Sequence, residues 1–66
     1  MDEDTLLEQA QAIAGEPATA ASWLAFAAIY NQTDDQALKF MLSDLATGLM
    51  RELVANQIPY KEDALS

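Results

Sequence analysis

Apolar residues recur every three or four positions along most of the chain, which is the spacing of one face of an α-helix. The first such segment predicts a helix over 4–14, with Leu6, Ala10 and Ile13 on one side. Acidic residues stand at its start, where negative charge complements the helix N-terminus. Gly15 follows the last periodic residue, so we expect it to end the helix in a left-handed conformation.

The second segment predicts a helix over 17–30, because Pro17 suits the first position of a helix. Trp23, Phe26 and Tyr30 fall on one stripe of this helix, which fits either an ordinary core or an anchor for a partner. Hardly any polar residue interrupts the other side. A helix that is apolar all round is normally buried all round, and a short chain has little protein to cover it. This segment therefore favours self-association.

The third segment predicts a long helix over 34–57, starting at a capping box of Thr33 and Gln36 and ended by Pro59. An extended apolar stripe runs along it and is expected to face the core. Its members are Leu38, Met41, Leu42, Leu45, Leu49 and Leu53.

Phe40, Met50 and Val54 lie outside that stripe, roughly on the opposite side of the same helix. They are therefore candidates for contact with another protein chain. Gly48 lies in the helix interior, where glycine costs about 1 kcal/mol relative to alanine. Either another backbone packs closely against Gly48, or it is a tolerated surface glycine.

These segments predict an all-α fold of one domain, with two short helices, one long C-terminal helix and a short tail. A domain of this size buries only about 60% of the surface its unfolded chain exposes. The 66 residues include no Cys and no His, so disulfides and ordinary zinc sites are excluded as additional supports. Among the usual additional supports of a small domain, oligomerisation is the one that stays open. We therefore expect a homo-oligomeric helical bundle, with a dimer favoured.

The charge balance limits the choice of partners. Eleven acids against three bases give a net charge of −8, which argues against direct contact with nucleic acid or an anionic membrane. The longest low-polarity run, 18–30, has 13 residues, fewer than the roughly 20 that a bilayer requires. The acidic start has the wrong charge for a signal peptide. We expect a soluble, cytoplasmic protein.

Little in the sequence supports catalysis. Without His or Cys the usual nucleophile–base pairs cannot be built, and two glycines make no phosphate loop. The acids lack the spacing of a calcium loop. We therefore predict no catalytic residue, no cofactor and no metal site, and a protein that is not an enzyme.

A non-enzymatic protein-interaction module that regulates, inhibits or assembles a larger partner is the leading functional hypothesis. The predicted contact residues, for self-association or for a partner, are Trp23, Phe26, Tyr30, Phe40, Met50 and Val54. One alternative is an acidic inhibitor that mimics nucleic acid, in which Glu8, Asp34 and Asp35 would face a partner's basic groove. A second alternative is a purely structural, self-assembling subunit. In size and composition the chain is similar to small phage- or plasmid-encoded regulators and to small bacterial chaperone and adaptor subunits.

Overall fold

Three α-helices and one short 3₁₀ turn make up the computed structural model, which describes residues 3–65. They are α1 (Glu3–Ala14), α2 (Ala20–Gln32), α3 (Gln36–Ala55) and η1 (Glu62–Ala64). No strand occurs in these residues, which confirms the all-α class with two short helices followed by a longer one. Within the same range, no helix combines the length and the apolar character needed to cross a bilayer.

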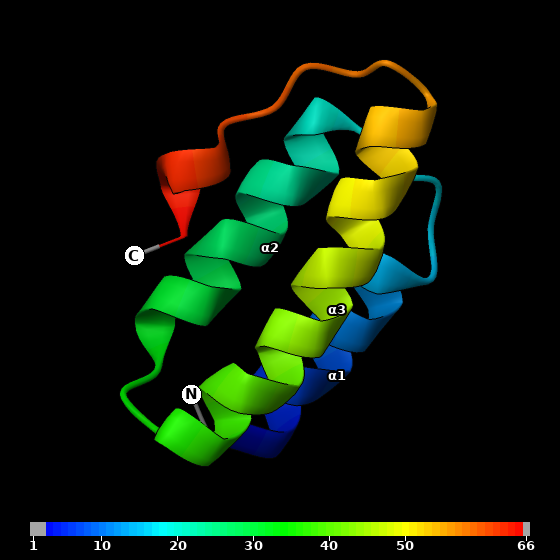
Figure 1. Cartoon of the computed structure of the whole chain (residues 1–66). Helices are drawn as coiled ribbons and strands as arrows, with labels where there is room; N and C mark the ends of the chain where they lie inside the picture. Colours follow the sequence, from blue (N-terminus) through cyan, green and yellow to red (C-terminus); the bar gives the residue numbers. More distant parts are fainter. Residues whose placement is uncertain (1–2, 66) are drawn as a thin grey trace.

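The three helices form one bundle in which each contacts the other two. Figure 1 shows α2 and α3 side by side, with α1 behind them. The chain after α3 arches over one end of the bundle and returns beside α2, where η1 contacts it. The bundle encloses a single apolar core, made of Leu6, Ala10, Ala18, Trp23, Phe26, Ile29, Leu38, Leu42, Ala46, Leu49 and Leu53.

The predicted core stripe of α3 is correct except at one edge. Leu38, Leu42, Leu49 and Leu53 are buried, whereas Met41 is 45% exposed. At 100° per residue, Met41 lies nearly a quarter-turn from the centre of the buried stripe, so its side chain leaves the core. Met41 therefore belongs to the surface of α3.

The start of α2 differs from the prediction. The helix begins at Ala20 and not at Pro17, and Thr19 is its N-cap. The Thr19 hydroxyl accepts a hydrogen bond from the Ser22 amide (3.0 Å). The Ser22 hydroxyl in turn accepts one from the Thr19 amide (2.8 Å). This reciprocal capping box satisfies two amides that the helix itself leaves free. Pro17 lies in the α1–α2 connection.

Two other predicted helix ends are also corrected. Gly15 does not have a positive φ; its amide donates to the Gln11 carbonyl (3.0 Å) and continues the helical turn. At the start of α3, Asp35 is the cap, because its carboxylate accepts from the Leu38 amide (3.0 Å). The Thr33 hydroxyl instead accepts from the Asp35 amide (3.1 Å), a local turn that places the real cap two residues later.

α3 ends at Ala55, earlier than predicted, in a Schellman motif. The Gln57 amide donates to the Val54 carbonyl (3.1 Å), and the Ile58 amide donates to the Leu53 carbonyl (2.9 Å). Gln57 adopts a left-handed conformation with φ of 58°, a position that glycine usually fills. Ile58 then packs against the core, so the motif also directs the chain back over the bundle.

The C-terminal segment, residues 58–65, packs against α2 through contacts with Trp23. The Trp23 side chain is fully buried, and its indole Nε1 donates a hydrogen bond to the Lys61 carbonyl. The Tyr60 ring meets the indole edge-on, with the two ring centroids 5.0 Å apart. The Phe26 ring stacks against the same indole, with the centroids 6.5 Å apart. Further along, the Asn31 side-chain Nδ2 donates to the Ala64 carbonyl (2.8 Å). Residues 58–65 therefore supply the cover that α2 lacks from the other helices.

Replacing Trp23 with phenylalanine should lower the free energy of unfolding by about 1–3 kcal/mol, because it removes the bond to Lys61 and leaves a void. That is a large share of the roughly 3–5 kcal/mol available to so small a domain. Urea unfolding followed by circular dichroism measures the change. The neighbouring Leu24→Ala, at a position 48% exposed, serves as the control and should cost less than about 1 kcal/mol. Equal losses in the two variants would contradict the anchoring role of Trp23.

Gln57→Gly should raise the free energy of unfolding by about 0.5–1 kcal/mol, since glycine adopts the left-handed conformation of this position without steric cost. Gln57→Ala keeps the Cβ and should give no such gain. The same urea titration compares the two variants. A Gly variant no more stable than the Ala variant would show that Gln57 is not strained here.

Candidate protein-interaction surface

The side of α3 that points away from the core carries several exposed apolar side chains. Phe40 is 73% exposed, Val54 65% and Met41 45%. Phe40, Thr47 and Val54 follow one another at intervals of seven residues, so they lie along one line of the helix. We call this surface the outer face of α3 and define it by Phe40, Met41, Asp44, Thr47, Gly48, Arg51, Val54 and Ala55, all of which are exposed.

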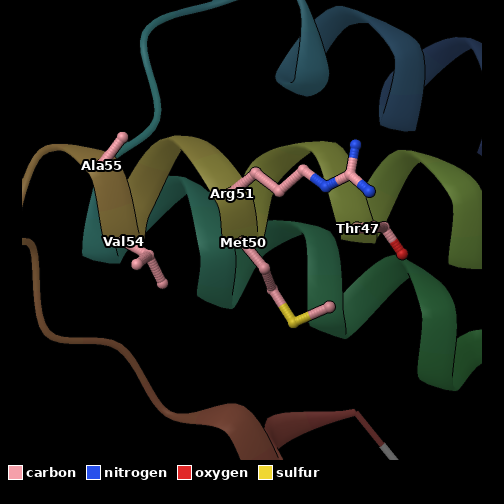
Figure 2. Close-up of a pocket in the computed structure, with 5 residues that line it drawn as sticks. All are labelled: Thr47, Met50, Arg51, Val54 and Ala55. Atoms are coloured by element: carbon pink, nitrogen blue, oxygen red, sulfur yellow. The ribbon is translucent and has the colours of Figure 1, made fainter.

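A shallow hollow of about 360 Å³ lies toward the C-terminal half of this helix. Figure 2 shows Met50 and Val54 projecting to the same side of α3, while Arg51 lies along the helix toward Thr47. Every lining residue comes from α3, so the hollow has no opposite wall. A small-molecule site usually buries most of its ligand between several walls, which one helix cannot do. The hollow is suited to a side chain presented by another protein.

Charge is distributed very unevenly between α3 and the rest of the chain. The first 35 residues contain seven acids and no base. Within α3, Lys39 and Arg51 balance Asp44 and Glu52, so its side chains sum to zero. The outer face of α3 is therefore nearly neutral, with exposed apolar side chains around one acid and one base, on a strongly acidic protein.

The aromatic stripe predicted on α2 occupies the interior. Trp23 and Phe26 are both 0% exposed, as an ordinary core requires. Tyr30 is half-buried, and the Lys39 ammonium stands over its ring at 5.2 Å from the centroid. Met50 is half-buried against the core, while Phe40 and Val54 face solvent. Of the predicted contact residues, these last two offer the most surface, and their role in binding stays a prediction.

Gly48 lies on the exposed side of α3. A Cβ placed on it would meet no atom within 4 Å among the described residues. No helix of the same chain crosses α3 at this point. Close packing of another backbone against Gly48 would therefore need a second chain, and it stays a prediction.

The three acids that we expect to face a basic groove if the protein mimics nucleic acid lie in two regions. Glu8 is exposed on α1, and Asp34 is exposed in the α2–α3 connection. Figure 1 shows that this connection lies at the same end of the bundle as the start of α1. Asp35 is half-buried, and one of its oxygens is used to cap α3. Among the described residues, no group of three acidic side chains is arranged to hold a metal ion.

One surface feature was missed in the sequence. Leu24 on α2 is 48% exposed and lines a second hollow of about 330 Å³, together with Ala20, Pro59, Tyr60 and Lys61. This hollow exists only because the C-terminal segment returns over α2. Helical periodicity gives no signal for that contact.

Comparison of the chain with protein-family models, curated proteins and solved structures finds no match. The function is accordingly inferred from the chemistry of the surface.

Gly48→Ala should raise the free energy of unfolding by about 1 kcal/mol in dilute solution, because alanine is the better helix former and its methyl group meets open space. Thermal unfolding at low protein concentration measures the effect. Ala46→Gly, at a buried position of the same helix, should instead destabilise the chain. A loss of stability in Gly48→Ala would mean that α3 is packed closely at this point even in the single chain.

Proposed function

We propose that this chain is a small, acidic, non-enzymatic protein-interaction module that contacts other protein chains through the outer face of α3. The observation that carries the proposal is the exposure of Phe40 and Val54 on one side of a helix whose opposite side already forms the core. The core does not need these two side chains. An exposed apolar surface on a small protein is typical of a protein–protein contact.

The energetics favour a contact centred on Phe40. Fully burying a phenylalanine or valine side chain contributes about 1.5–3 kcal/mol, and both residues are still mostly in water in the free chain. Aromatic side chains are also enriched in the small set of residues that dominate interface energies. Regulation, inhibition and assembly of a larger protein would all use such a contact.

The residues near the surface support binding and give no reason to propose catalysis. The hollow beside Val54 is lined by one hydroxyl, one guanidinium and apolar groups. The chain contains no His or Cys to serve as a general base or a nucleophile near neutral pH.

A second candidate function is mimicry of nucleic acid by the acidic surface. The seven acids in the first 35 residues, with no base among them, favour it. Exposed carboxylates such as Glu8 and Asp34 would then face a basic groove on the partner. The affinity of such an acidic contact would fall steeply as the salt concentration rises, because exposed charges are screened. The affinity of a contact that buries Phe40 would change little with salt.

The test is a pull-down from a lysate of the source cells, with the tagged chain compared with Phe40→Asp at low and high salt. We expect the unchanged chain to retain a stoichiometric partner at both salt concentrations. Phe40→Asp should lose that partner, because the new carboxylate cannot be buried in an apolar contact. Leu24→Asp, an exposed apolar position on α2, is the matched control and should retain the partner.

A partner that is released by salt and retained by Phe40→Asp would contradict the proposal and favour mimicry. Loss of the partner in Leu24→Asp alone would place the contact on α2 instead. Circular dichroism of both variants checks that each keeps its helices.

A further inference from the structure

We infer that the outer face of α3 pairs with the same face of a second copy of this chain, antiparallel about a twofold axis beside Thr47 and Gly48. The inference rests on the proposed function in one respect, namely that this face is a protein interface. It goes further by naming the partner and the register. The order of side chains along α3 determines this register.

In an antiparallel twofold pair, a residue a given distance before the midpoint meets a residue the same distance after it. Asp44 and Arg51 are equally far from the point between Thr47 and Gly48, and both are exposed near the centre line of the face. Asp44 therefore lies opposite the partner's Arg51, and Arg51 opposite the partner's Asp44. Within one chain the two are seven residues, or roughly 10 Å, apart along the helix axis. The second copy thus places an opposite charge across the interface from each of these two groups.

The apolar residues lie beyond the ion pairs at both ends of the face. Phe40 is 7.5 residues before the midpoint and Val54 is 6.5 residues after it, and both lie on one side of the centre line. Phe40 therefore faces the partner's Val54 with an offset of one residue, roughly 1.5 Å. Met41 and Ala55 lie on the other side of the centre line, so Met41 faces the partner's Ala55 with the same offset. Each large, exposed side chain faces a smaller one, which allows close packing without a clash.

The midpoint of the pair is built for close approach. Outside its own helical turn, no atom of residues 3–65 stands within 4 Å of where a Gly48 Cβ would be, so the backbone of a second helix has room there. Thr47 is the other central residue, and its hydroxyl already donates to the Ser43 carbonyl of its own helix (3.0 Å). Removing water from Thr47 therefore leaves no unsatisfied hydroxyl donor.

The charge of the whole chain favours this face over the others. Two copies that each carry a net charge of −8 repel one another wherever acids approach. The charged side chains of α3 sum to zero, so contact there avoids the seven acids of the first 35 residues. The exposed side of α2 is also uncharged, but Leu24 is its one large exposed residue and no charge pair fixes a register.

The size of the face sets the strength of the pair. A helix of 20 residues is roughly 30 Å long, and a face about 12 Å wide gives on the order of 700 Å² buried in total. This is below the roughly 1,200 Å² of stable complexes. The dimer is therefore reversible, with a monomer–dimer equilibrium in the micromolar range.

Sedimentation velocity over a series of protein concentrations tests the register by exchanging the two charges. Asp44→Arg and Arg51→Asp should each raise the dimer Kd by at least about tenfold, because each places like charges opposite one another twice. The double variant Asp44→Arg/Arg51→Asp restores both pairs and should return to within about threefold of the original Kd. An equimolar mixture of the two single variants should form a heterodimer of the same strength.

A chain that stays monomeric at high micromolar concentration would overturn the inference. So would a dimer that both single variants leave unchanged, or a double variant no better than the singles. These failures are separable from failure of the proposed function. A monomeric chain whose partner in the lysate is still lost by Phe40→Asp keeps the α3 surface as an interface but excludes a second copy as its occupant. Circular dichroism confirms that every variant is folded.

Discussion

Burial of Trp23 is the interaction on which the rest of the structure depends. A buried indole must be covered on all sides, and its N–H needs an acceptor once water is excluded. The C-terminal segment meets both needs, with the Lys61 carbonyl as acceptor and the Tyr60 ring against the indole edge. The Schellman turn at Gln57 makes this possible, because it reverses the chain at the end of α3. Within the described residues, one apolar core is thereby covered by segments of the same chain.

This closure decides which surfaces are left for binding. Because the tail covers Trp23, the aromatic stripe of α2 is part of the core of the single chain. The opposite side of α2 is lined mainly by alanines, which are small enough to remain in water at little cost. The exposed side of α3 is different, since Phe40 and Val54 are large and mostly in water. The acids, concentrated in the first 35 residues, keep the remainder of the surface well hydrated.

The sequence predicted the elements well and their ends less well. Periodicity identified three helices and placed Leu42 in the core and Phe40 on the surface, because both follow from position on the helix. The ends depend on hydrogen bonds of single side chains. Thr19 pairs with Ser22, which is not the usual Glu or Gln of a capping box, so the start of α2 gave no clear signal.

The tertiary contacts of the tail could not be read from the sequence. The bond from Trp23 to Lys61 joins residues 38 positions apart, and no local pattern encodes it. That contact explains why Trp23 is fully buried and why a hollow forms beside Leu24. The candidate surface was predictable in part: Phe40 and Val54 were found because they lie outside the apolar stripe that faces the core. Met41 was misplaced because it lies at the edge of the buried stripe.

The central claim is that the folded single chain meets other proteins through the outer face of α3. Backbone and indole ¹H–¹⁵N NMR spectra, recorded from dilute to concentrated protein and then with the captured partner, test it most directly. We expect the resonances of the exposed residues from Phe40 to Ala55 to shift, while the indole signal of Trp23 stays fixed. Shifts confined to Leu24 and its neighbours, or to Glu8 and Asp34, would place the contact elsewhere. A Trp23 indole signal that moves with concentration would contradict the claim that the single chain closes its own core.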